Sequence, residues 1–147
     1  MAMTNTQDDP AKLNSQYRTL LILWLAFLWM FAIYYFLPVF ISGHEEPNKQ
    51  LLIVFNVMSP LLVVVSFFVK RKFLARSVEA HDVKLVNTGF IVAAALCEAG
   101  ALIGLLDSLV AHDRYYFILI GFAMVGLVLH FPKRSHLEAA SFKGALT

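Results

Sequence analysis

The amino-acid sequence predicts an all-α integral membrane protein in which four transmembrane helices form one bundle. Hydrophobic residues make up 59% of the 147 residues and charged residues only 15%, whereas soluble domains are about 45–50% apolar and about 25% charged. The apolar residues are gathered in four runs, and Lys and Arg are concentrated in alternate connections. This composition excludes a soluble enzyme and a disordered chain. A single cysteine, Cys97, excludes an intramolecular disulfide.

The four apolar runs define the expected membrane layout. The predicted spans are 19–42, 51–69, 86–110 and 115–131, with 24, 19, 25 and 17 residues. A spanning helix needs roughly 20 apolar residues, with a range of about 17–25. Backbone polar groups in lipid must be satisfied within their own segment, so each run should be helical. The short connections predict antiparallel neighbours in one membrane domain, 19–131, with polar tails at 1–18 and 132–147.

The distribution of positive charge predicts the orientation. Ten Lys and Arg residues lie in the two tails and in the connection 70–84, whereas the other two connections contain only Lys49 and Arg114. Cytoplasmic loops carry an excess of Lys and Arg, so both termini are expected in the cytoplasm of a bacterium, with the spans in its inner membrane. The basic connection is either a solvated anchor or a helical turn on anionic lipid, with Phe73 and Leu74 in the interface.

Glu98 is the residue with the most unusual environment. It is the thirteenth residue of the 25-residue third run, so it is expected near the bilayer midplane, where an ionised carboxylate costs at least ~2.5 kcal/mol. No Lys or Arg lies inside any run to pair with it, and we expect a neutral Glu98 that donates a hydrogen bond. Pro60 frees the backbone carbonyl of Asn56, which predicts a polar cluster of Glu98, Asn56 and Ser59. The cluster either holds helices together or binds a proton or cation.

Small residues surround Glu98 on the third run. Gly100 and Gly104 form a GxxxG pair, and Ala93, Cys97 and Ala101 form a second small stripe. Such residues allow helix backbones to approach closely. The third helix is therefore expected to be the most buried, with Cys97 as an inert thiol.

One segment resembles a known family. The run Glu98-Ala99-Gly100-Ala101-Leu102-Ile103-Gly104-Leu105 is similar to the carboxylate helix of rotary ATP synthase proteolipids. In that family a mid-membrane Glu is followed by Ala, then by an aliphatic residue at +4, Gly at +6 and Leu at +7. Ala99, Leu102, Gly104 and Leu105 match that pattern. The resemblance is confined to this helix, and it implies that Glu98 is a reversible proton or sodium site.

The remaining polar and aromatic residues predict less specific features. Asp107 is expected to be a solvated carboxylate near the outer membrane surface, and His130 is expected to cap the last carbonyls of the fourth helix. The first run is aromatic, which predicts a surface that faces lipid or a partner, or that lines a quinone or pigment. The candidate outer metal cluster is His44, Glu45, His112 and Asp113. Its spacing follows no metal motif, and neither a metal nor a cofactor is predicted.

The function expected from these features is not enzymatic. We expect an accessory or structural subunit of a larger bacterial membrane complex, whose partners are lipids and other membrane subunits or further copies of this chain, and not nucleic acid. The alternative is a proton- or cation-handling protein that uses Glu98. A further alternative is the binding of a quinone, pigment or lipid. No phosphate-binding loop, nucleophile elbow or metal-protease motif is present in the sequence.

Overall fold

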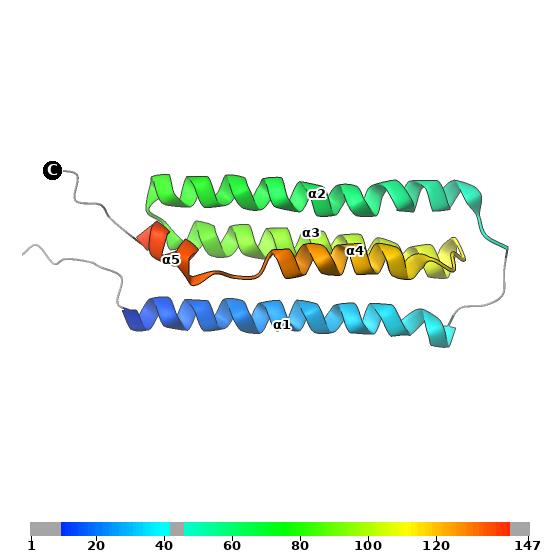
Figure 1. Ribbon diagram of the computed structural model, residues 1–147, viewed down its shortest axis with the longest axis horizontal. Helices are drawn as coiled ribbons and strands as arrows, with labels where there is room; N and C mark the ends of the chain where they lie inside the picture. Colours follow the sequence, from blue (N-terminus) through cyan, green and yellow to red (C-terminus); the bar gives the residue numbers. More distant parts are fainter. Residues whose placement is uncertain (1–9, 42–45, 142–147) are drawn as a thin grey trace, which may run out of the picture.

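A computed structural model describes residues 10–41 and 46–141, and this part of the chain is helical without any strand. The helices are α1 (Pro10–Ile41), α2 (Lys49–Ala80), α3 (Val83–Val110), α4 (Tyr116–Leu129) and α5 (Arg134–Ser141). Figure 1 shows α1 to α4 aligned along one long axis, with α5 at the end where α1 begins and α2 ends. The prediction of an all-helical protein is confirmed.

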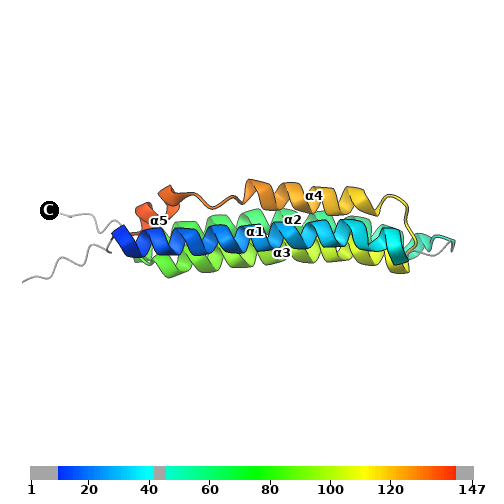
Figure 2. The same cartoon turned by 90° about the horizontal axis from the view of Figure 1, so that it is seen from below.

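Three of these helices are long and apolar enough to cross a membrane, namely α2, α3 and the Leu13–Ile41 part of α1. They support a multi-pass membrane protein. Helix α4 has only 14 residues, about 21 Å at 1.5 Å per residue, whereas the hydrocarbon core is about 30 Å thick. It reaches spanning length only together with α5, from which it is bent by 46° (Figure 2). Helix α4 ends two residues before Phe131, because a residue that precedes proline is disfavoured in the α conformation.

At the basic end, α2 continues well beyond its apolar run. It ends at Ala80, where His81 adopts a left-handed conformation (φ 49°, ψ 41°) and its backbone N–H bonds the carbonyls of the last turn. Asp82 then caps α3 by accepting the Lys84 N–H at 2.8 Å. Lys, Arg and Ala are good helix formers, so this segment needs no lipid to be helical. Phe73 is half-buried against α3, where a Cβ on Gly89 would lie 2.5 Å from the Phe73 Cβ.

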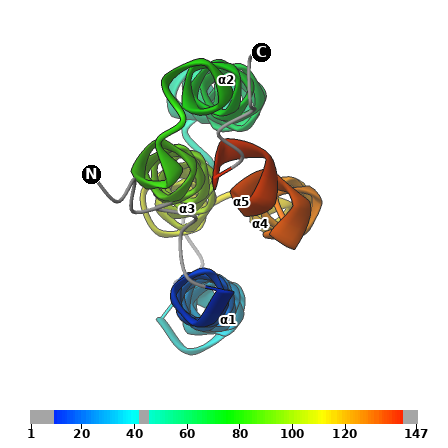
Figure 3. The same cartoon turned by 90° about the vertical axis from the view of Figure 1, so that its left-hand side faces the viewer.

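Helix α3 occupies the centre of the molecule. It packs against every other helix, and Figure 3 shows α1 and α2 on opposite sides of it. Since α1 and α2 make no contact within the described residues, the prediction that they are neighbours is wrong. The seven residues between Ile41 and Lys49 can reach at most ~25 Å. Two interaxial distances of about 8–10 Å are within that reach, so this connection can pass an intervening helix.

Small side chains allow α3 to take this central position. In its most apolar stretch 44% of the residues are buried, against 17% in α1 and in α2, which confirms that it is the most buried of the three long helices. Ala93, Cys97 and Ala101 are fully buried. A Cβ on Gly100 would lie 3.2 Å from the Ser59 carbonyl oxygen of α2, and one on Gly104 would lie 2.9 Å from Ile120 Cγ1 of α4. Gly100 therefore allows α2 to approach α3 closely, and Gly104 allows α4 to do so.

Candidate functional site

Glu98 is held by a partner from α1. The Tyr34 hydroxyl donates a hydrogen bond of 2.9 Å to Glu98 Oε1. Tyr34 is buried and Glu98 is half-buried, so the bond joins α1 to α3 within the apolar part of the bundle. The structure therefore gives Glu98 the role of acceptor, whereas the sequence analysis expected a donor. Tyr34 was missed because it lies among many aromatic residues of the first run, where only its hydroxyl distinguishes it.

Helix α2 does not bring Asn56 to Glu98. Asn56 is exposed, and its amide nitrogen donates to the Leu52 carbonyl of its own helix at 2.9 Å. Ser59, which is buried next to Pro60, donates instead to the Gly100 carbonyl of α3 at 2.9 Å. Two residues correspond to about 200° of rotation around a helix axis. Glu98 and Gly100 therefore face opposite sides of α3, toward α1 and toward α2, and the three predicted members form no single cluster.

A second polar cluster joins α2, α3 and the end of α4. Ser66 Oγ lies 2.7 Å from His130 Nε2 and 3.4 Å from Cys97 Sγ, and it donates to the Val63 carbonyl at 2.6 Å. A hydroxyl has one proton, so a Ser66 that donates to Val63 accepts its hydrogen bond from the Nε2–H of His130. The Lys70 ammonium donates to the His130 carbonyl at 3.1 Å. These contacts fix the position at which α4 ends.

The structure turns the His130 ring inward. The ring is 1% exposed and lies 4.3 Å from the ring of Phe67, measured between centroids. Its backbone N–H, and not its side chain, bonds the last carbonyls of α4. The expected role as a side-chain cap is therefore wrong. The sequence contained one signal for the inward position. Apart from the two tyrosines, His130 is the only polar residue in the run 115–131, and a buried polar group needs a hydrogen-bond partner within the bundle.

Asp107 is buried, contrary to the expectation of a solvated carboxylate. Its exposed fraction is 0%, and neither carboxyl oxygen accepts a hydrogen bond from the residues that the structure describes. The carboxyl group of Asp113 lies beside it, and the Asp113 N–H donates to the Asp107 backbone carbonyl at 3.2 Å. The turn after α3 folds back over the helix end, on the side where Asp107 and Ser108 are buried.

The predicted outer metal cluster is placed only in part. His44 and Glu45 lie outside the described residues. Asp113 Oδ1 accepts the Tyr115 N–H at 3.0 Å, so this carboxylate caps the turn that leads into α4. His112 lies in the same turn, with a φ of 55°. Over residues 10–41 and 46–141, no group of three or more His, Cys, Asp or Glu side chains is placed to hold a metal ion.

The aromatic residues of α1 divide into two faces. Trp24 Nε1 donates to the Leu127 carbonyl of α4 at 3.0 Å. The rings of Trp24 and Phe131 pack edge to face, with their centroids 5.2 Å apart. Phe31 is buried with Tyr34 in the core. Trp29 and Phe40, in contrast, are 72% and 84% exposed. The inward rings therefore fix α1 to the bundle, and the outward rings form an apolar surface.

Comparisons with known proteins add nothing to this geometry. No protein family, curated protein or solved structure matches the chain. The similarity of residues 98–105 to ATP synthase proteolipids therefore stays a prediction that rests on the sequence of one helix. What the arrangement can do chemically follows from the contacts alone: Glu98 can join α1 to α3, or it can exchange a proton beside the Tyr34 hydroxyl.

Proposed function

We propose that this protein is a non-enzymatic, four-span accessory or structural subunit of a larger complex in the inner membrane of a bacterium. The observation that carries the proposal is the hydrogen bond from Tyr34 to Glu98. A carboxyl group that receives a donor from another helix acts as an interhelical contact, which is the common use of polar side chains between membrane helices. Ser59 joins α2 to α3 in the same way.

The chain path supports four spans with both termini in the cytoplasm. Helix α4 leads back toward the end where α1 begins, and α5 lies at that end (Figure 1). Basic residues in the last part of α2 and after α4, among them Lys70 and Lys133, lie at this same end, whereas Lys49 begins α2 and Arg114 precedes α4 at the opposite end. The positive-inside rule assigns the more basic end to the cytoplasm.

The outward face of α1 supports assembly with other subunits or with further copies. Trp29, Phe36 and Phe40 are 72%, 58% and 84% exposed. Their spacing of seven and four residues places them on one side of the helix. Aromatic residues are enriched where proteins contact each other, because they bury a large area in a rigid side chain. A partner subunit that packs on this side would cover all three rings.

The test is a gentle detergent extraction followed by native mass determination of everything that co-migrates. We expect stoichiometric larger partners with the wild-type chain and with Glu98→Gln, because the glutamine carbonyl still accepts from Tyr34. Glu98→Leu leaves the Tyr34 hydroxyl without its acceptor, and the complex should be lost. A homogeneous small oligomer without partners would contradict the proposal, as would normal assembly of Glu98→Leu.

The second candidate function is proton or cation handling at Glu98. It is favoured by the half-buried position of this carboxyl group and by the resemblance of residues 98–105 to the proteolipid helix. In this case Glu98→Gln would abolish ion flux into liposomes while leaving the helical content unchanged. A third candidate, the binding of a quinone, pigment or lipid by the aromatic α1, requires that such a molecule co-purifies with the protein.

A further inference from the structure

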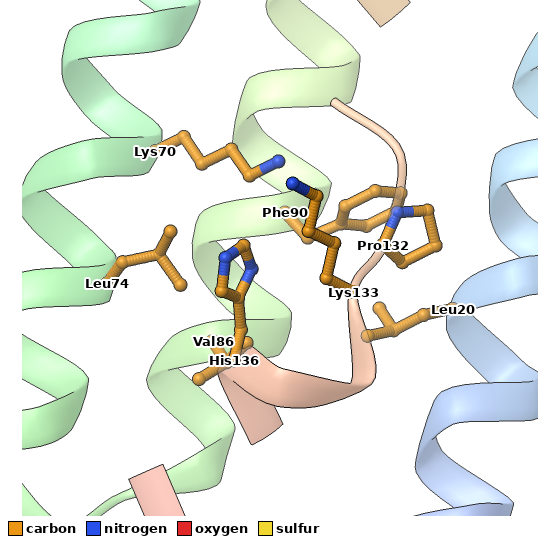
Figure 4. A pocket seen from close by; sticks show the side chains of 8 residues that line it. All are labelled: Leu20, Lys70, Leu74, Val86, Phe90, Pro132, Lys133 and His136. Atoms are coloured by element: carbon orange, nitrogen blue, oxygen red, sulfur yellow. The ribbon is translucent and has the colours of Figure 1, made fainter. Parts of the chain in front are cut away.

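A shallow cavity lies at the basic end of the bundle, where four helical segments meet. Its lining comes from Leu20 of α1, Lys70 and Leu74 of α2, Val86 and Phe90 of α3, and Pro132, Lys133 and His136 around the start of α5. Its enclosed volume is only about 10 Å³, so it is a shallow recess, and a ligand larger than a water molecule lies in its open mouth. Figure 4 shows that side chains from all of these segments point into it.

Positive charge converges on this cavity without a carboxylate in its lining. Figure 4 shows the ammonium groups of Lys70 and Lys133 pointing toward each other across the cavity, with the His136 ring nearby. None of the eight lining residues is acidic. Two cations that face each other repel, and an anion bound between them is attracted to both.

The two lysines differ in how they are held. Lys70 is half-buried, and its donation to the His130 carbonyl at 3.1 Å fixes the direction of its side chain. An ammonium group has three donors, so this one bond leaves capacity for a ligand. Lys133 is exposed and can close over an anion from the other side. Burial lowers the pKa of His136, and the charges of Lys70 and Lys133 lower it further, which is the effect of a positive potential in the cavity.

The position of the cavity selects the kind of anion. Lys70 directly follows the apolar run 51–69, Leu20 is at the start of run 19–42, and Pro132 follows run 115–131. In a membrane this level is the border between the hydrocarbon core and the headgroups. Basic pockets between membrane helices at this depth bind the headgroups of anionic lipids.

We propose that this cavity binds the phosphate group of an anionic phospholipid, with Lys70 and Lys133 as counter-charges and His136 as a hydrogen-bond donor. This inference requires the apolar runs to lie in a bilayer, but it requires neither a partner subunit nor a proton site at Glu98. It therefore stands or falls separately from the proposed function.

The test measures lipid retention by native mass spectrometry of the full chain, equilibrated with mixed micelles of phosphatidylglycerol and phosphatidylcholine. We expect the wild type to retain phosphatidylglycerol preferentially. Each basic residue near a membrane surface contributes about a 5-fold preference for anionic lipid through its charge alone. Lys70→Gln combined with Lys133→Gln should therefore reduce the preference by more than about 30-fold, because these two side chains also contact the phosphate. The matched control combines Arg71→Gln with Lys72→Gln, two exposed neighbours outside the cavity, and removes the same charge.

The control variant loses only the general attraction of two surface charges, at most about 30-fold. The cavity variant should lose clearly more, because it also removes the two groups that contact the phosphate. Equal losses in the two double variants would overturn the proposal, because net charge alone would then explain the binding. Absence of any preference in the wild type would also overturn it. Displacement of the lipid by millimolar inorganic phosphate would overturn the lipid as ligand in favour of soluble phosphate. Lys133→Gln alone alters an exposed side chain and keeps the fold. If the double variant misfolds, the loss caused by Lys133→Gln should still exceed the loss of about 5-fold expected for Lys72→Gln alone.

Discussion

The tightest contact of α4 allows a quantitative test of the packing. A Cβ on Gly126 would lie 2.6 Å from Val63 Cγ1 of α2 and 3.2 Å from Cys97 Sγ of α3. Carbon atoms in contact prefer about 3.5–4.0 Å, so Gly126→Ala requires α4 or α2 to move by about 1 Å. Val63 is 2% exposed and has no free space to enter. Overpacking of this kind costs typically about 1–3 kcal/mol.

Gly121 of the same helix is the matched control. A Cβ on Gly121 would meet nothing within 4 Å, so Gly121→Ala adds only the better helix propensity of alanine, about 1 kcal/mol. Both substitutions gain this propensity, and the difference between them isolates the overpacking. We expect Gly126→Ala to be less stable than Gly121→Ala by about 1–3 kcal/mol.

The assay is unfolding by dodecyl sulfate in mixed micelles, followed by circular dichroism and by the fluorescence of the two tryptophans. Equal free energies of unfolding for Gly126→Ala and Gly121→Ala would refute the packing argument. A double variant that adds Val63→Ala to Gly126→Ala provides a second check. Its destabilisation should be smaller than the sum of the two single effects by about 1 kcal/mol, because contacting residues couple.

Three further outcomes follow from the buried polar groups. Ser66→Ala should destabilise the protein by about 1–3 kcal/mol, because the buried His130 ring loses its 2.7 Å partner. The control Ser77→Ala removes only a bond to Leu74 of its own helix, so it should lower the free energy of unfolding by less in the same assay. Cys97 is fully buried, so its alkylation by N-ethylmaleimide should be slow in native micelles and fast in dodecyl sulfate, and equal rates would contradict its burial. Burial lowers the pKa of His136; its neutral form therefore contributes stability at pH 7 that is lost as the pH falls through this lowered pKa. An NMR titration should place the pKa below about 6.5, and anionic lipid should raise it.

Hydropathy located the apolar segments but not the full helices. The second run ends at Val69, whereas α2 ends at Ala80, because a helix continues through any good helix former once it is nucleated. The fourth run of 17 residues yields a helix of 14, because proline and histidine end it early. Hydropathy reports where lipid is favourable, and the backbone signals that begin and end a helix act independently of it.

The contacts between helices were less predictable than the helices. A membrane helix is apolar on all sides, so no amphipathic pattern shows which face meets which neighbour. The sequence therefore favours Asn56, on the adjacent helix along the chain, as the partner of Glu98, whereas the structure supplies Tyr34 from α1. The small residues of α3 were a better guide. Close approach depends on side-chain size at one position, and Gly100 and Gly104 could be recognised without knowing the partner.

The short α4 has a consequence for the membrane around it. If α4 crosses the bilayer without α5, the bilayer meets hydrophobic heights of different length on different sides of the protein, since the 14 residues of α4 measure only about 21 Å. Lipids beside α4 must shorten their acyl chains, at a cost of fractions of a kcal/mol for each ångström of mismatch. Such one-sided thinning is an elastic strain, and it is relieved when a neighbouring protein replaces the lipid or when the membrane itself is thin. The protein should therefore concentrate in thinner regions of a bilayer, oriented by the side on which α4 lies.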